Sequence, residues 1–236
     1  MASQISAPVP GVAVLWPRGL NTRLYLDLNR VARHSVWAHT FMHAYALWLG
    51  PVVLAATVVL AYAVVWWRRS LHAAALLVLG GIGTLAALGL NQLVGHAARE
   101  LRPYDAHPHA LVLVARTNDY AFPSDHAVLA GGLLATVLLL IAPQAWHAVG
   151  RRRNGTRPTA FVAFAVSVNL VVGLFLCFAR VYVGAHYPGD VVAGLLFGMA
   201  VVGVLSLARA LAYALAESLG DSAFGVLVRR PRRFLS

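Results

Sequence analysis

Five long stretches of the chain contain no Asp, Glu, Lys or Arg, and they constrain its fold more than any other feature. Across the whole chain 60% of residues are hydrophobic and 11% are charged, whereas a soluble domain carries about 25% charged residues. A membrane-spanning helix needs about 20 consecutive, mainly apolar residues. The sequence therefore predicts an all-α integral membrane protein, a helical bundle of five to six membrane helices that include an N-terminal amphipathic helix. The uncharged stretches are 34–67, 70–98, 127–146, 158–179 and 191–208.

A charged segment precedes the first of these stretches. Leu20, Leu24, Leu28 and Val31 recur there at helical spacing with charged residues between them. Charged side chains are costly at the centre of a bilayer, so we expect this helix to lie in the membrane interface. We divide the chain into an irregular N-terminal tail, this amphipathic helix, one membrane domain and a basic tail, at 1–19, 20–35, 36–225 and 226–236.

The basic residues predict the orientation in the membrane. All 19 are Arg, and they give the chain a formal charge of +11. Because they lie in short runs between apolar stretches, they do not form the soluble basic face that nucleic-acid binding requires. Arg-rich loops stay in the cytoplasm, which puts 68–69, 144–158 and 226–236 inside and 99–126 and 180–190 outside. Five spans then leave the Arg-containing N-terminal helix outside, a conflict that a six-span arrangement would remove.

The two predicted outer segments hold the polar residues that suggest chemistry. Arg102 and Arg180 offer planar donor pairs that suit phosphate oxygens. Pro123-Ser124 is typical of a helix start, with Ser124 as the cap, and helix N-termini bind phosphate. Pro188 is a good first helical residue. Asp190 then reaches back towards the cap, and we expect it to accept a hydrogen bond from Nδ1 of His186.

A second histidine completes this set. His126 follows Ser124 and Asp125 in the first predicted outer segment. It is a titratable group from a different helix, as a general acid opposite His186 requires. Asp125 suits the first turn of a helix because its charge is favourable to the helix dipole. That charge would also repel phosphate, so its role stays open. Arg99 lies close to Arg102 in the sequence.

The order and spacing of these residues resemble the type 2 phosphatidic acid phosphatase superfamily, which includes vanadium haloperoxidases. Its motifs are Lys, six residues and Arg-Pro; then Pro-Ser-Gly-His; then Ser-Arg, five residues, His, three residues and Asp. The resemblance covers roughly 70–205. This chain departs from it at Gly95 in place of Lys, Asp125 in place of Gly, and Ala179 in place of Ser. Pro-Ser-Asp-His, the missing Lys, a Glu near Arg-Pro and His-Tyr-Pro before Asp190 make the chain resemble one subgroup, the bacitracin-resistance-type undecaprenyl-pyrophosphate phosphatases.

The resemblance implies hydrolysis of a lipid pyrophosphate without metal or cofactor, at the outer face of a bacterial cell membrane. His186 would attack phosphorus to form a phospho-histidine, Asp190 would orient it, and His126 would protonate the leaving oxygen. The substrate would be the C55 or C50 polyprenyl carrier of cell-wall synthesis. Membrane lipids are the other expected partners, and the oligomeric state is open. Substrate contacts are assigned to Arg102, Arg180, Ser124, Asp125 and, as a substitute for the missing Lys, Arg99; His96 is the alternative substitute.

Other functions remain in competition with this hypothesis. The first alternative is a phosphatase of phosphatidate or phosphatidylglycerol phosphate, which would use the same residues. A transporter would place charges inside several spans, and the spans predicted here are nearly free of charge. An inactive scaffold is disfavoured because His126, His186 and Asp190 are all present. A haloperoxidase is disfavoured because those relatives are soluble. His107 and His109 lack the spacing of a zinc site, so we expect them in a lid over the site.

Overall fold

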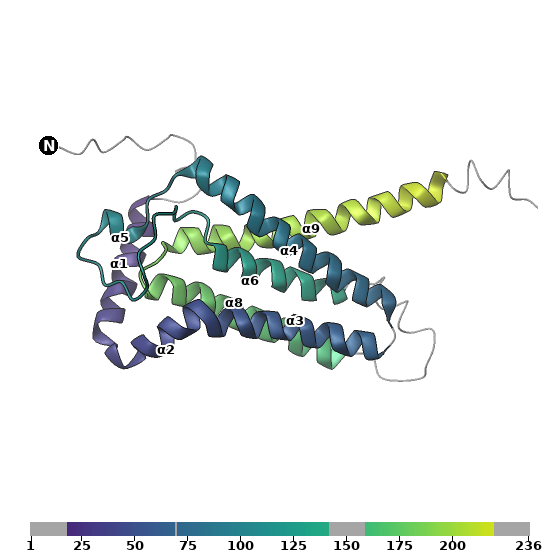
Figure 1. The fold of residues 1–236 in the computed structure, drawn as a ribbon, viewed down its shortest axis with the longest axis horizontal. Helices are drawn as coiled ribbons and strands as arrows, with labels where there is room; N and C mark the ends of the chain where they lie inside the picture. Colours follow the sequence, from purple (N-terminus) through teal and green to yellow (C-terminus); the bar gives the residue numbers. More distant parts are fainter. Residues whose placement is uncertain (1–17, 69, 142–158, 220–236) are drawn as a thin grey trace, which may run out of the picture.

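The apolar stretches form a bundle of helices in the computed structural model, which describes residues 18–68, 70–141 and 159–219. The described part is helical, without strands. Figure 1 shows the main helices side by side, with α9 reaching beyond the others. The expected all-α bundle is thus confirmed. Its helices are α3 (Gly50–Trp67), α4 (Leu71–Ala98), α6 (Asp125–Leu138), α8 (Thr159–Tyr182) and α9 (Pro188–Leu219).

Four helical segments of the described chain are long and apolar enough to cross a membrane. The first joins η1 (Val36–Ala38), α2 (His39–Ala44), the π-helical turn η2 (Tyr45–Leu49) and α3 without interruption. Large apolar side chains such as Val59, Leu85 and Phe164 are exposed on these helices. In water such a surface would be unfavourable, but lipid chains cover it in a bilayer. The protein is a multi-pass membrane protein. The four segments are Val36–Trp67, Ala73–Ala106, Ala160–Tyr182 and Pro188–Ala210.

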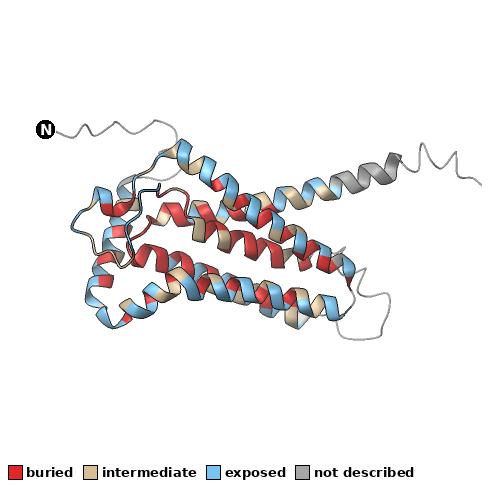
Figure 2. Ribbon diagram, in the orientation of Figure 1, coloured by how far each residue is buried: buried red, intermediate tan, exposed pale blue. Residues whose placement is uncertain are grey.

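Helix α6 differs from the other helices because protein surrounds it. It contacts α3, α4, α8 and α9, and nearly all its residues from Ala127 to Val137 are buried (Figure 2). Together with the short 3-10 helix η3 (Leu139–Ile141) it forms an apolar helix that is shorter than a standard span. The predicted third span ran to 146, and its last residues lie outside the described part. The central place of α6 fixes the position of its N-terminus, where the Pro-Ser-Asp-His sequence lies.

Glycines allow the backbones of α6 and α9 to approach closely. A Cβ on Gly198 would overlap the backbone of Val128, and a Cβ on Gly131 would overlap the backbone of Leu195. Small residues at such crossings permit close helix packing in membranes. These contacts set the distance between two helices that carry site residues.

The N-terminal helix α1 (Arg18–His34) lies across one end of the bundle (Figure 1). Its polar side chains bind the backbone there. The Asn21 side chain accepts a hydrogen bond from Gly189 N–H over 2.8 Å. Asn29 donates to the Leu111 carbonyl over 2.8 Å and accepts from Leu111 N–H over 3.0 Å. The helix predicted over 20–35 therefore exists, does not run through the bundle, and holds two segments of the candidate site in place.

Candidate active site

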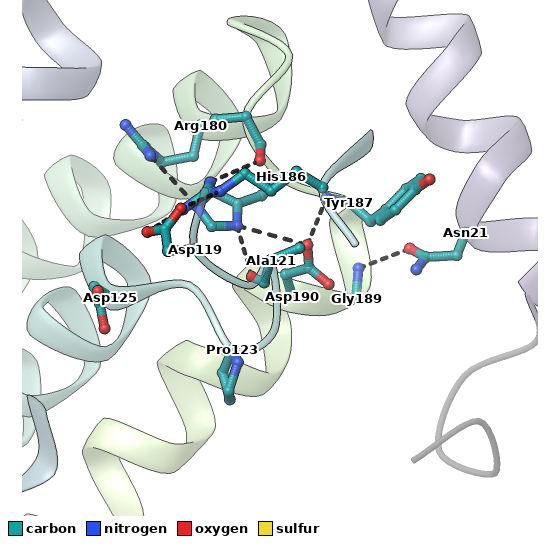
Figure 3. A network of polar contacts seen from close by, with 12 residues as sticks. Asn21, Asp119, Ala121, Pro123, Asp125, Arg180, His186, Tyr187, Gly189 and Asp190 are labelled. Atoms are coloured by element: carbon teal, nitrogen blue, oxygen red, sulfur yellow. Dashed lines mark hydrogen bonds and ion pairs between the residues drawn. The ribbon is translucent and has the colours of Figure 1, made fainter. Parts of the chain in front are cut away.

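Three segments that are distant in sequence meet at this end of the bundle. They are the connection between α4 and α6, the start of α6, and the turn between α8 and α9 (Figure 3). Ser124 N–H, at the start of α6, donates to the Asp190 carbonyl over 3.1 Å, and within the connection between α4 and α6 Ala121 N–H donates to the Glu100 carbonyl over 2.8 Å. Gly184, with φ of +82°, makes the left-handed turn after α8. The chain thereby places His186 among residues from all three segments.

The imidazole of His186 is buried, with 2% of the residue exposed. Its Nδ1 lies 2.8 Å from the carbonyl oxygen of Ala121. A carbonyl only accepts hydrogen bonds, so Nδ1 carries the proton and Nε2 keeps its lone pair. Burial, then the positive charges of Arg180 and Arg102, lower the pKa of His186 well below its ordinary value. The ring is therefore neutral near pH 7, with Nε2 as a nucleophilic atom.

Asp190 does not make the hydrogen bond that the sequence suggested. Its Oδ2 lies 3.6 Å from Nδ1 of His186 and instead accepts from Tyr187 N–H over 2.8 Å. Pro188 begins α9, so Asp190 is its third residue and reaches back to the cap, as in a capping box. That part of the expectation is correct. The role of direct partner to Nδ1 belongs to the Ala121 carbonyl, which no residue spacing could reveal.

Arg180 is a buried cation with unused donors. Only 6% of the residue is exposed, and its Nη2 lies 3.3 Å from Nε2 of His186. Within the described part of the chain, its Nε and Nη1 are buried without a hydrogen-bond partner. Burying an unpaired charge is costly, and a bound anion would offset that cost. Arg180 is therefore a candidate anion-binding residue beside the nucleophilic nitrogen.

Ser124 supplies another unused polar atom. It occupies the cap position of α6, as expected, but its side chain makes no capping hydrogen bond. Its Oγ is buried and lacks a partner among the described residues. His126 follows two residues later, in the first turn of α6, near enough for the charges of Arg180 and Arg102 to act on it. Ser124 and His126 therefore bring a hydroxyl and a second imidazole to the N-terminus of α6.

Arg102 is held more firmly than Arg180. Its Nε and Nη2 each donate to one carboxylate oxygen of Asp119 over 2.8 Å. Its Nη1 donates to the Ala185 carbonyl over 3.0 Å and lies 3.2 Å from Nε2 of His186. Sequence reasoning did not assign Asp119 to the site. The available signal was an acidic residue in the same segment as Arg102.

The comparison with known proteins agrees with this geometry. The PAP2 superfamily sequence profile matches residues 74–214. The chain belongs to the PAP2 superfamily. The match includes every residue of the three motifs, from Arg102 to Asp190, so the resemblance expected from the sequence is confirmed.

Several PAP2 relatives carry functional names. The undecaprenyl-diphosphatase BcrC of Bacillus subtilis is 30% identical over 125 residues, 53% of this chain and 53% of that protein. The putative undecaprenyl-diphosphatase YbjG of Escherichia coli is 28% identical over 188 residues, 79% and 80% of the two chains. A lipid A 1-phosphatase of Rhizobium etli is 35% identical over 136 residues, 56% and 46% of the two chains.

The coverage of these relatives is uneven. The chain spans about half the length of several curated PAP2 relatives that it matches. A crystal structure of a transmembrane PAP2-type phosphatidylglycerolphosphate phosphatase from Bacillus subtilis gives a TM-score of 0.44 at 18% identity. That match covers 80% of this chain and 93% of the other.

Two predicted PAP2 substrate contacts point away from the site. The Asp125 carboxylate accepts hydrogen bonds from Asn91 over 2.7 Å and from Gln92 over 3.0 Å, so it ties α6 to α4. Figure 3 shows Asp125 apart from His186 and Asp190. Arg99 is exposed, caps α4 with φ of 50°, and donates from Nε to the His96 carbonyl over 3.2 Å. In this conformation Arg99 does not replace the Lys of the PAP2 motif.

His96 and the loop histidines also have structural contacts outside the PAP2 motifs. His96 is exposed, and its Nδ1 lies 2.7 Å from the Gln92 carbonyl. The ring of His107 stacks on Tyr25 with centroids 6.0 Å apart, and Arg33 donates to the His109 carbonyl. Within the described residues, no three His, Cys, Asp or Glu side chains are grouped so that they could hold a metal ion. His107 and His109 thus bind the loop to α1.

Proposed function

We propose that this PAP2 protein hydrolyses undecaprenyl or decaprenyl pyrophosphate to the monophosphate and so recycles the lipid carrier of cell-wall synthesis. The observation that carries the proposal is Arg180, a buried guanidinium whose Nε and Nη1 lack partners in the described chain, beside Nε2 of His186. Buried guanidinium N–H donors of this kind fit the oxygens of a phosphoryl group. The protein acts in the bacterial cell membrane, with this site on the extracytoplasmic side.

The mechanism follows from the groups around the anion site. Nε2 of His186 attacks the terminal phosphorus, and an N–P bond forms as the bridging P–O bond breaks. His126 gives a proton to the departing monophosphate oxygen and then takes one from water, whose oxygen attacks the phospho-histidine and releases phosphate. Arg102, Arg180 and Ser124 hold the phosphoryl oxygens, together with the first-turn N–H groups of α6. Phosphoryl transfer relies mainly on positioning and charge stabilisation, and the residues supply both.

The names of the relatives support the substrate class. BcrC and YbjG are both named undecaprenyl-diphosphatases. Relatives named lipid A 1-phosphatases favour a second candidate, the release of phosphate from another lipid. Phosphatidate and phosphatidylglycerol phosphate belong to that candidate, because the same donors would hold their phosphate. The arrangement around His186 serves either substrate, so the lipid has to be identified by measurement.

The test is phosphate release by the purified protein in detergent with EDTA. Polyprenyl pyrophosphate, polyprenyl phosphate, phosphatidate, phosphatidylglycerol phosphate and lipid A are compared as substrates. We expect release from the pyrophosphate to be fastest, to persist in EDTA, and to vanish in His186→Ala. The matched control is His34→Ala, since His34 is exposed on α1.

Each departure from this result has a definite meaning. Faster release from another lipid would replace the substrate but keep the mechanism. Full turnover in His186→Ala, with the protein folded, would refute the phospho-histidine. Activity lost in EDTA and restored by Mg²⁺ would refute a metal-independent reaction.

A further inference from the structure

Asp119 is the carboxylate that binds an arginine of the site directly. It takes the Nε–Nη2 edge of Arg102 with two hydrogen bonds of 2.8 Å. We propose that Asp119 is a positioning residue, which holds the Arg102 guanidinium so that Nη1 faces the phosphorus attacked by His186. This inference rests on the proposed function and adds a residue outside the three motifs to its machinery.

Two fixed anchors determine where Nη1 points. Asp119 holds one edge of the guanidinium, and the Ala185 carbonyl accepts from Nη1 on the other side over 3.0 Å. A planar group bound at both edges cannot rotate about its last bond. Nη1 consequently stays 3.2 Å from Nε2 of His186. When Nε2 bonds to phosphorus, an oxygen of that phosphoryl group comes within reach of Nη1.

Asp119 is itself held by its neighbours in the loop. The Thr117 hydroxyl donates to Asp119 Oδ1. The Thr117 carbonyl accepts from the Tyr104 hydroxyl over 3.1 Å, and Thr117 N–H donates to that hydroxyl over 3.0 Å. Tyr104 is buried, with 1% exposed, in the short helix α5 (Pro103–Ala106) that follows Arg102. The loop is therefore fastened to the same turn of chain that carries Arg102.

Asp119 keeps its negative charge in this setting. Partial burial raises its pKa, but hydrogen bonds from Arg102 and Thr117 and the charge of Arg102 outweigh burial and lower it. Its side chain is 57% exposed, whereas that of Arg102 is 8% exposed. The carboxylate thus lies at the opening of the site and the guanidinium inside it.

The two arginines of the site consequently have different roles. Arg180 has free donors and can bind the incoming phosphoryl group, whereas most Arg102 donors are already engaged. Nη1 contributes most when phosphorus moves towards Nε2, in the transition state. Interactions that strengthen only in the transition state raise kcat and leave KM nearly unchanged. Removing Asp119 should therefore change kcat.

The experiment compares Asp119→Ala and Asp119→Asn with the full-length wild type in detergent. We expect kcat to fall about tenfold to a hundredfold in Asp119→Ala, as for other small misplacements in active sites, without a rise in KM. Asp119→Asn keeps the volume and part of the hydrogen bonding, so its loss should be smaller. Asp27→Asn is the matched control, since Asp27 pairs with Arg30 on the exposed face of α1. An unchanged or higher kcat in Asp119→Ala would overturn the proposal, because it would mean that Asp119 merely competes with phosphate.

A double-mutant cycle tests whether Asp119 acts through Arg102. Lysine cannot donate two coplanar hydrogen bonds to one carboxylate, so Arg102→Lys removes the anchored geometry. We expect Asp119→Ala to cost little further kcat when it is added to Arg102→Lys, because residues in one network are not additive. Full additivity of the two losses would overturn the positioning role.

A binding measurement covers the case in which turnover is not seen. Orthovanadate adopts the geometry of a phosphoryl group under attack, whereas inorganic phosphate does not. We compare their affinities from the shift in unfolding temperature, at mildly acidic pH where both are mainly monoanions. We expect Asp119→Ala to lower the ratio of vanadate to phosphate affinity about tenfold, and an unchanged ratio would overturn the inference. A wild type that hydrolyses no lipid would refute the proposed function, while this ratio would still decide the role of Asp119.

Discussion

Arg180 illustrates at the residue scale how a site can oppose the stability of its own fold. Its guanidinium is buried beside His186, and its Nε and Nη1 have no hydrogen-bond partner among the described residues. Arg102, by contrast, shares its charge with Asp119. Because an unpaired buried cation is costly, Arg180 is retained for what it binds.

Arg180→Gln should accordingly separate stability from activity. We expect the free energy of unfolding to rise by about 1 to 2 kcal/mol, the usual gain when a strained functional group is removed. The turnover number should fall about a hundredfold or more, as when an oxyanion donor is lost. Thermal unfolding in detergent and phosphate release measure the two effects. Arg23→Gln, on the exposed face of α1, should change neither, and a less stable Arg180→Gln protein would contradict the argument.

The sequence predicted side chains of the site better than it predicted their partners. Motif spacing identified His186, Arg102 and Arg180, and the structure brings these three together. It could not identify the Ala121 carbonyl as the partner of Nδ1, because a backbone oxygen leaves no mark in the residue pattern. Asp119 was missed for a related reason, since its contact depends on the path of the loop.

At the scale of elements, apolar runs predicted the helices because lipid and protein interior impose the same requirement on a backbone. Every backbone polar group must be satisfied within the helix. The runs could not show which helix the others would surround. Composition is alike for a helix that faces lipid and for α6, which faces protein on nearly all sides. The small residues on α6, Gly131 among them, were the available signal.

The crossing of α6 and α9 can be tested with one methyl group. In Gly198→Ala, the added Cβ would overlap the backbone of Val128, so the helices must move apart. We expect the unfolding free energy to fall by about 1 to 3 kcal/mol, the usual cost of overpacking, as measured by thermal unfolding in detergent. Gly203→Ala on the same helix is the matched control, because no neighbouring helix of the described chain comes within 4 Å of its Cβ position. Equal stability of the two variants would show that the crossing is looser than described.

At the scale of the whole molecule, α1 lies at the same end of the bundle as the two segments predicted to be outside, 99–126 and 180–190. The hydrogen bonds from Asn29 to Leu111 and from Gly189 to Asn21 establish this. The sequence raised a conflict here, because α1 brings Arg residues to the end that was predicted to be outside. Two of them are engaged locally, Arg30 with Asp27 and Arg33 with the His109 carbonyl. Local pairing of this kind weakens the contribution of these charges to orientation.

The predicted orientation can be tested by thiol labelling in intact cells. The chain has one cysteine, Cys177, which is buried. Arg99→Cys would place a thiol at the site end, and Trp67→Cys would place one at the opposite end, where Trp67 is 87% exposed. We expect a membrane-impermeant maleimide to label Arg99→Cys in intact cells and Trp67→Cys only after permeabilisation. The reverse pattern would put the site in the cytoplasm.

The contacts of α1 also have a practical consequence for handling the protein. Asn21, Asn29 and Tyr25 join α1 to the rest of the described chain, and a harsh detergent that weakens these few contacts would detach it. Losing it would release the Leu111 loop and the start of α9 while the bundle stayed helical. A preparation can thus look intact by circular dichroism and be inactive, and adding back phospholipid is the remedy that this architecture suggests.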